Sequence, residues 1–159
     1  MEAMKTFLPG LLVLSAIGVQ AAQPVKPNAA AADPRSRAYA ATTVAEAQRL
    51  LGIAEAPLPG KRVLLEVPHI VAAASTRGAA VTARVTSAMP GTDWMAVLVE
   101  RGPQPLVRYK DFAPGAKQVL EVQLHLQQTT RVRALVRSEG KVYQVVREVK
   151  VARPGSDPL

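Results

Sequence analysis

The sequence predicts an all-β fold, a β-sandwich of about seven strands with one short helix in front of it. After Pro59, short segments alternate apolar and polar residues, and pairs that contain Gly or Pro separate these segments. The apolar share of the chain is 48%, supplied mainly by Val, Leu and Ala, while aromatic residues make up only 4%. Such side chains suit a compact aliphatic core, so we expect one small folded domain.

The first 21 residues are predicted to form a secretory signal peptide. Lys5 precedes an apolar run over residues 7–19, which is too short and too interrupted to span a membrane. Ala21 is the small residue after which we expect cleavage of a Sec-type leader and export of the mature chain. A retained amphipathic anchor is the alternative interpretation. Residues 22–42 are rich in Ala and Pro and are predicted to be a flexible arm.

A short helix is predicted directly after this arm. Thr43 is followed three residues later by Glu46, the pattern in which each side chain bonds the backbone N–H of the other residue. Gly52 can adopt the left-handed conformation that ends a helix. The apolar residues of this segment share one face, on which the helix should dock: Val44, Ala47, Leu50 and Leu51.

Seven segments are then predicted as strands, because their apolar residues recur with a period of two or form a continuous run. These segments are residues 62–67, 79–86, 94–99, 106–112, 119–126, 131–137 and 141–151. Two of them should point regular rows of residues into the core: Leu120, Val122, Leu124 and Leu126, and Val132, Ala134 and Val136. Glu139-Gly140 predicts a tight hairpin. The folded domain should therefore span residues 43–152, with a free tail at 153–159.

The composition excludes most catalytic sites. With no cysteine among its 159 residues, the chain has no disulfide, thiolate zinc site or cysteine nucleophile. Its two histidines, His69 and His125, lie in separate predicted elements, so we expect no metal site. The sequence contains no Gly-x-Ser-x-Gly motif and no Gly-rich phosphate loop. We therefore predict a protein that is not an enzyme and that holds no cofactor.

The net charge of +8 limits the classes of partner. Residues 1–21 hold one acid and one base, so the mature chain keeps this charge. An exported protein meets little nucleic acid, and the sequence has no cluster of Lys and Arg with interleaved aromatic residues. Anionic proteins, small oxyanions or an acidic lipid surface are better partners.

Three arginines on one predicted strand face, Arg131, Arg133 and Arg137, form the candidate partner or anion face, together with His125. Two interpretations of the arginines stay open: a solvated outer face that prevents edge pairing, and a docking face for an acidic protein. For His125, an exposed strand position is the alternative to a functional role. Trp94, the only tryptophan, is predicted to be a core anchor rather than a partner hot spot.

Several short motifs follow one another in the order found in a known family. Leu50-Leu51-Gly52 ends the helix before a Pro/Gly linker, Val67-Pro68-His69-Ile70 follows the first strand, and Met89-Pro90 precedes the central strand. Further motifs are Leu98-Val99-Glu100, Pro105-Leu106, Gln127-Gln128-Thr129-Thr130, Ser138-Glu139-Gly140-Lys141-Val142-Tyr143 and Glu148-Val149-Lys150-Val151. With these motifs, residues 43–151 resemble the SoxY family, the sulfur-carrier subunit of periplasmic thiosulfate oxidation.

The resemblance implies an immunoglobulin-like sandwich that forms a heterodimer with a second sandwich, SoxZ, in the periplasm. It also implies a C-terminal Gly-Gly-Cys-Gly-Gly arm, whose thiol holds the sulfur intermediate. This chain departs from that pattern, because residues 153–159 contain no cysteine and the hydroxyl of Ser156 cannot form the S–S link. The leader departs as well: the family typically uses the twin-arginine route, and this leader carries only Lys5.

Three functions are compatible with the sequence. The first is a non-catalytic, SoxY-like interaction protein that binds a SoxZ-like partner without carrying sulfur. The second is a true carrier whose C-terminal arm is missing from this sequence through truncation. The third is an unrelated periplasmic module that uses its basic face to bind an anion or a protein.

Overall fold

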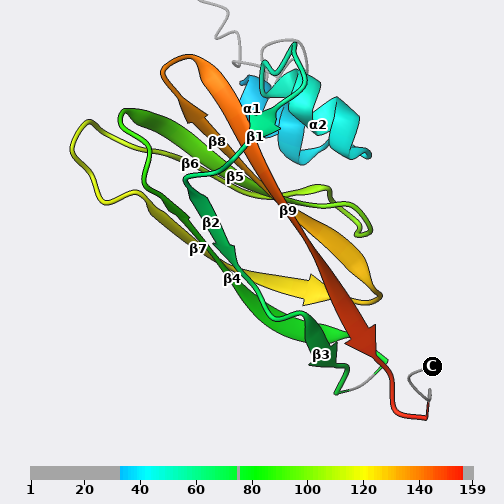
Figure 1. The fold of residues 1–159 in the computed structure, drawn as a ribbon. Coiled ribbons are helices and arrows are strands. Elements are labelled where there is room, and N and C mark those ends of the chain that lie inside the picture. Colours follow the sequence, from blue (N-terminus) through cyan, green and yellow to red (C-terminus); the bar gives the residue numbers. More distant parts are fainter. Residues whose placement is uncertain (1–32, 75, 156–159) are drawn as a thin grey trace, which may run out of the picture.

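The structure, a computed structural model, describes residues 33–74 and 76–155 and consists of two β-sheets with a small helical layer (Figure 1). Within these residues the chain forms two helices and nine strands. The elements are α1 (Pro34–Tyr39), α2 (Val44–Leu50), β1 (Leu58–Pro59), β2 (Val63–Glu66), β3 (Ile70–Ala72), β4 (Ala79–Ser87), β5 (Thr92–Val99), β6 (Leu106–Asp111), β7 (Val119–Leu126), β8 (Thr130–Ser138) and β9 (Lys141–Ala152). All seven predicted strands are confirmed.

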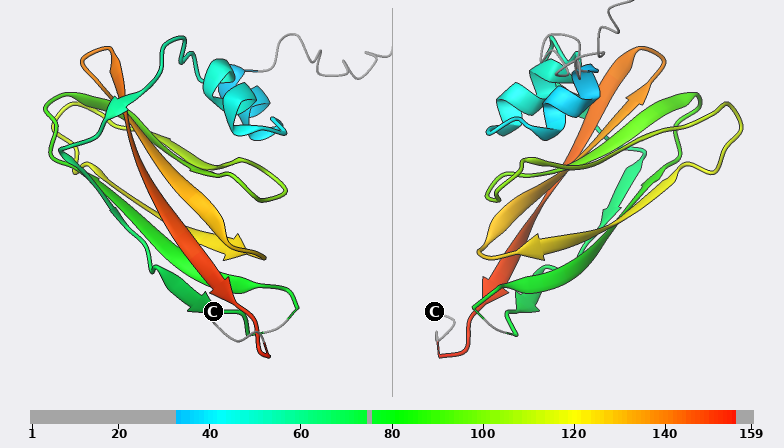
Figure 2. Two further views of the ribbon diagram at one scale, coloured as in Figure 1. Left: turned by 45° about the vertical axis from the view of Figure 1, so that its right-hand side comes forward. Right: turned by 180° about the vertical axis from the view of Figure 1, so that it is seen from behind.

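The larger sheet has the order β1-β9-β8-β5-β6, with β3 also paired to β9, and the smaller sheet has the order β2-β4-β7. This arrangement is the immunoglobulin-like sandwich that we predicted. The short strands β1 and β3 are additional to the prediction, and both pair with β9 in parallel. Between them the chain crosses to the smaller sheet as β2 and then returns to β9 as β3, so one segment pairs with β9 near both of its ends (Figure 2).

The main core lies between the two sheets, and strand alternation places its residues there. On β7, Leu120, Leu124 and Leu126 are at most 2% exposed, and Val122 is partly buried against the same cluster. On β8, Val132, Ala134 and Val136 are fully buried. Both predicted inward rows are confirmed.

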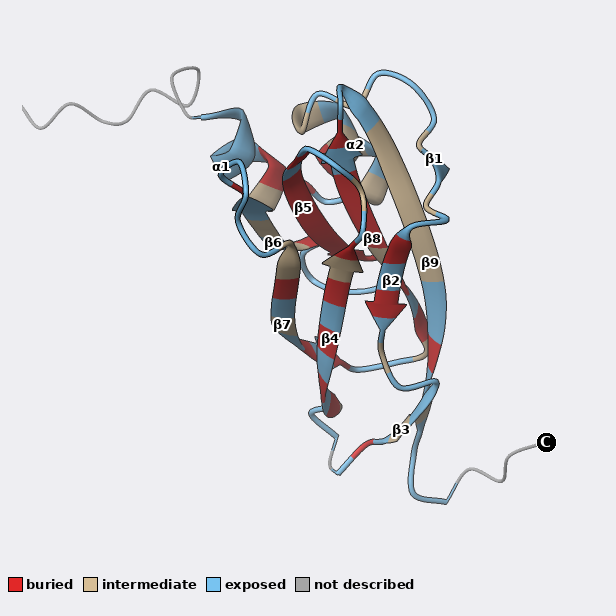
Figure 3. Ribbon diagram, turned by 60° about the vertical axis from the view of Figure 1, so that its left-hand side comes forward, coloured by how far each residue is buried: buried red, intermediate tan, exposed pale blue. Residues whose placement is uncertain are grey.

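A second apolar cluster lies on the opposite face of the larger sheet, under the helices. Trp94, Ala96 and Leu98 of β5 point into it, together with Leu106 and Leu135. Strand β5 is therefore buried on both faces, which explains its continuous apolar run (Figure 3). The prediction that Trp94 is a core residue is confirmed, because its side chain is 5% exposed.

The start of α2 follows the predicted capping pattern with one change. Thr43 Oγ1 accepts a hydrogen bond from the Glu46 backbone N–H at 3.1 Å. The Glu46 carboxylate accepts from the N–H and the hydroxyl of Thr42, rather than from Thr43. Gly52 follows the helix at a φ of 82°, as expected. The cap therefore involves Thr42, Thr43 and Glu46, and it connects the residue before the N-cap to the helix.

The flexible arm predicted at 22–42 is wrong for its last ten residues. Asp33 accepts a hydrogen bond from the Arg35 N–H and begins α1, whose Ala38 is fully buried. Ala41 is also buried, so α1 docks on the larger sheet beside α2. The small residues Ala38 and Ala41, which are typical of a linker in sequence, allow α1 to pack closely on the larger sheet. The predicted signal peptide and residues 22–32 lie outside the described residues.

At the other end, the tail predicted to be free at 153–159 begins with a bound residue. The Arg153 guanidinium donates to the Gln127 carbonyl oxygen at 3.2 Å. The prediction is therefore wrong for Arg153, while residues 156–159 lie outside the described residues. In the part of the chain that the structure describes, neither helix is long and apolar enough to cross a membrane.

Gly78 is the glycine whose replacement should perturb the fold most directly. At its φ of 98°, an added Cβ would lie 2.4 Å from the Leu126 carbonyl oxygen. Gly115 has a similar φ of 78° but nothing within 4 Å of its Cβ position. We expect Gly115→Ala to cost about 1–2 kcal/mol through the left-handed backbone alone. Gly78→Ala should lower the free energy of unfolding by about 1–3 kcal/mol more, because of the clash. Urea unfolding measures both losses. Equal losses in the two variants would contradict the close approach of Gly78 to Leu126.

Candidate functional site

The three arginines of β8 point to the helix-covered side of the larger sheet but do not form one surface. Arg133 is ion-paired with Glu100 at 2.8 Å and donates to Gln144 Oε1 at 2.6 Å. Its guanidinium is thus committed to a structural role at the sheet surface. Leu135, buried under the helical layer, separates it from Arg137.

The other two arginines differ in their surroundings. Arg137 lies 3.7 Å from the Asp93 carboxylate and lines a hollow beside Trp94. Arg131 is exposed and forms no ion pair with a described residue. Of the predicted row, Arg131 is therefore the exposed arginine without an ion pair among the described residues, although Glu148 lies opposite it on β9.

His125 is an exposed residue near the end of β7 in the smaller sheet, and so does not share a face with the arginine row. A residue that sequence analysis missed connects the two regions. Arg101 lines one hollow with His125 and an adjacent hollow with Arg131. The structure thus groups His125 with Arg101 and Arg131. Arg133 adjoins this group through its ion pair with Glu100, and Arg137 lines a separate hollow.

An aromatic cluster joins α1 to the free edge of the larger sheet at β6. The Tyr109 ring lies 5.3 Å from the Trp94 ring, centroid to centroid, and the Arg35 guanidinium stacks over Tyr109 at 4.9 Å. Arg35 also forms an ion pair with Asp111, to which the Tyr109 hydroxyl donates at 2.9 Å. Burial and then the Asp111 carboxylate raise the pKa of Tyr109 to about 12. The phenol therefore stays protonated and serves as a structural donor.

The hydroxyl of Tyr39 blocks part of this sheet edge. It accepts a hydrogen bond from the Tyr109 backbone N–H at 2.8 Å, a donor that faces away from the paired strand β5. Helix α1 thereby occupies a position at which a further strand could pair. No sequence signal marks this contact, because the two residues are 70 positions apart and Tyr39 falls in the predicted arm.

Tyr39→Phe removes this acceptor and leaves the Tyr109 N–H without its partner. We expect a loss of about 1–3 kcal/mol in the free energy of unfolding, measured by denaturant titration. Tyr143→Phe is the matched control, because the Tyr143 hydroxyl has no hydrogen bond to a described residue. If the two variants were equally stable, the hydrogen bond between Tyr109 and Tyr39 would contribute nothing to stability.

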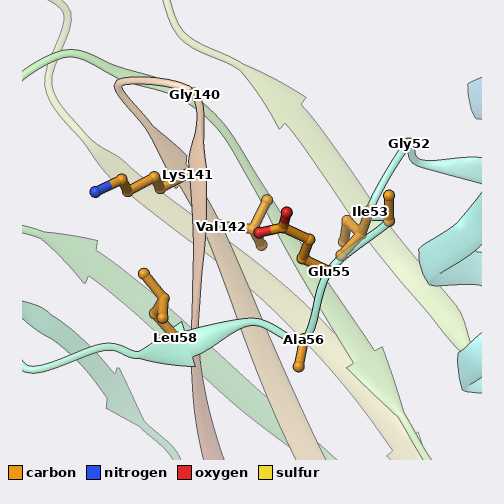
Figure 4. A pocket seen from close by; sticks show the side chains of 9 residues that line it. Gly52, Ile53, Glu55, Ala56, Leu58, Gly140, Lys141 and Val142 are labelled. Carbon is orange, nitrogen blue, oxygen red and sulfur yellow. The ribbon is translucent and has the colours of Figure 1, made fainter.

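A shallow cavity of about 340 Å³ opens between the segment that follows α2 and the β8–β9 hairpin (Figure 4). Ile53, Leu58 and Val142 supply its apolar lining, and Glu55 and Lys141 supply its charges. The two charged side chains extend in different directions and form no ion pair (Figure 4). The cavity thus has apolar contact surface and no arrangement of groups that could activate a nucleophile.

Neither nucleophilic nor metal chemistry has support in the described residues. They contain no group of three or more His, Asp or Glu side chains that could hold a metal ion. The whole chain lacks cysteine.

Comparison with known proteins gives the family. The model of the family described as sulfur oxidation protein SoxY matches residues 47–155, which is more than half of the chain. The chain belongs to the SoxY family. The resemblance seen in its local motifs is thereby confirmed, and an unrelated binding module is excluded. Among curated proteins, no significant match to this chain was found.

Solved structures support the same fold. The sulfur carrier protein SoxY from Chlorobium limicola f thiosulfatophilum is 24% identical, with a TM-score of 0.56 over 64% of this chain and 90% of that chain. A superoxide reductase (neelaredoxin) from Ignicoccus hospitalis is 18% identical, with a TM-score of 0.50 over 57% of this chain and 80% of that chain. These likenesses show a shared sandwich. Helix α1 lies outside the residues matched by the SoxY model. Its contact with the edge strand β6 is therefore not part of the region that matches the family.

Proposed function

We propose that this SoxY-family protein acts in periplasmic sulfur oxidation as a non-catalytic subunit that binds a SoxZ-like partner and carries no sulfur itself. The observation that carries the proposal is a SoxY-family sandwich with no cysteine among its 159 residues. A sulfur carrier needs a thiolate, because a reversible link to the sulfur intermediate is an S–S bond. Without that group, we assign partner binding to this chain as its role.

Charge supports an acidic partner surface. The chain has a net charge of +8, which accelerates encounter with an anionic protein. Arg131 is the exposed and unpaired member of the predicted arginine row, whereas Arg133 is held by Glu100. We therefore assign the docking role to the surface around Arg131 and not to the whole row.

Export supports the periplasmic location in this proposal. The segment of residues 1–21 has the features of a Sec-type leader, and a chain without cysteine has no thiol that an oxidising compartment could modify. Cell fractionation against a periplasmic marker, followed by N-terminal sequencing of the protein, tests this part. We expect a periplasmic protein that starts at Ala22, since cleavage follows Ala21. A protein that keeps Met1 and stays with the cytoplasmic fraction would contradict export.

Arg131→Glu tests the docking surface. At low salt we expect it to weaken binding to a SoxZ-like sandwich from the same organism by about tenfold, close to 1.4 kcal/mol, because it reverses an exposed charge. The effect should shrink at high salt. Binding is measured by co-purification and by titration calorimetry.

Arg62→Glu is the matched control, since Arg62 is exposed and lies just before β2, outside this surface. It makes the same change in net charge. Equal weakening by both variants would show that only net charge matters and would remove the docking role of Arg131. If the unmodified protein did not bind the SoxZ-like sandwich at all, the proposed function itself would fail.

A further inference from the structure

Arg101 is an exposed arginine held on a well-anchored loop. Its backbone N–H donates to Thr130 Oγ1 at 2.9 Å, and the neighbouring Glu100 N–H donates to the Arg131 carbonyl oxygen at 3.1 Å. The other side of the loop is closed by a bond from the Val99 N–H to the Pro105 carbonyl oxygen at 2.8 Å. The guanidinium itself has no hydrogen bond or ion pair with a described residue. The hydrogen-bonded backbone of this loop thus holds Arg101, whose side chain is unpaired among the described residues, at the surface.

The hollow beside Arg101 has a volume of about 260 Å³ and carries donor groups on several sides. Its lining residues are Arg101, His125, Gln127 and Gln128, whose side chains carry N–H donors, together with Gly102 and Pro103. No carboxylate lines it. By contrast, the adjacent hollow on the other side of Arg101 contains Glu100 and Glu148 beside Arg131. Of the two, the first hollow is therefore the one that groups side chains with N–H donors and includes no carboxylate residue.

We propose that this hollow binds a small oxyanion of the sulfate type. A guanidinium presents paired N–H groups that match the oxygen spacing of such an anion, and amide and imidazole N–H groups add further donors. The volume lies below that of ordinary pockets for organic ligands, about 300–1,000 Å³, and so suits an ion. Arg131 and Arg153 add positive charge nearby: Arg131 lines the adjacent hollow, and Arg153 bonds the Gln127 carbonyl oxygen. This anion site goes beyond the proposed partner binding and does not depend on it.

Sulfate titration followed by amide chemical shifts tests the site. Purified protein is titrated with sodium sulfate, while sodium chloride is adjusted to keep the ionic strength constant. We expect saturable shifts confined to the amides of residues 101–103 and 125–128. Shifts that are spread over the surface, or that do not saturate, would overturn the proposal. Thiosulfate is the second probe, because it has the same shape and charge as sulfate with one oxygen replaced by sulfur.

Two variants distinguish a defined sulfate-binding site from nonspecific electrostatic attraction. Arg101→Gln should weaken sulfate binding by at least about tenfold, since it removes the charged donor that lines the hollow. Arg62→Gln removes the same charge at an exposed position outside the hollow and should leave the affinity within about twofold. Equal losses in both variants would show attraction by net charge alone and would contradict a defined site. Partner binding is assayed separately without sulfate, so a failed anion site and a failed proposed function remain distinguishable.

Discussion

Leu124→Asp should lower the free energy of unfolding by about 3–5 kcal/mol, a large part of the 5–15 kcal/mol that typical domains possess. Leu124 is 1% exposed and lies between the two sheets, among the aliphatic side chains of the main core. An aspartate there would either bury an unpaired charge or take up a proton, and both cost free energy. Urea unfolding followed by circular dichroism measures the loss.

Gln123→Asp is the matched control for this prediction. Gln123 is the preceding residue on β7 and is exposed on the outer face of the smaller sheet. The same new charge at this position should change stability by no more than about 0.5 kcal/mol. A one-residue change in strand register would exchange the two results, so a stable Leu124→Asp and an unstable Gln123→Asp would contradict the register described for β7.

Regular alternation made the main strands predictable from sequence. In β7, inward leucines alternate with polar residues, and only one register places them in a core. The tight turn at Glu139-Gly140 was equally clear, and both residues have positive φ values, 51° and 77°. Where one face of a strand is apolar and the other polar, the sequence alone determines the orientation of that strand.

The elements that were missed depend on tertiary contacts. Strands β1 and β3 have two and three residues, too few for a periodic pattern, and they exist through parallel pairing with β9. Helix α1 has six residues in an Ala- and Pro-containing segment that resembles a linker. Its stability comes from the burial of Ala38 and the bond from Tyr109 to Tyr39, and neither contact has a local sequence signal.

The candidate site was only partly predictable for the same reason. Alternation correctly placed Arg131, Arg133 and Arg137 on one strand face, but it could not show that Glu100 holds Arg133. His125 was assigned to the same face, although it belongs to the other sheet. Its link to Arg131 runs through Arg101, which lies in an irregular loop where no period identifies a functional side chain.

The most direct test of the central claim is intact-mass spectrometry of the purified protein after incubation with thiosulfate, sulfite or polysulfide. We predict an unchanged mass, because the chain has no thiol that could attack or exchange a sulfur–sulfur bond. Ser156→Cys provides the positive control, since its thiolate should cleave polysulfide and retain sulfur as a persulfide. A stable gain of sulfur by the unmodified protein would contradict the account. An unchanged mass, with sulfur retained by Ser156→Cys, would support a SoxY-family subunit that does not carry sulfur itself.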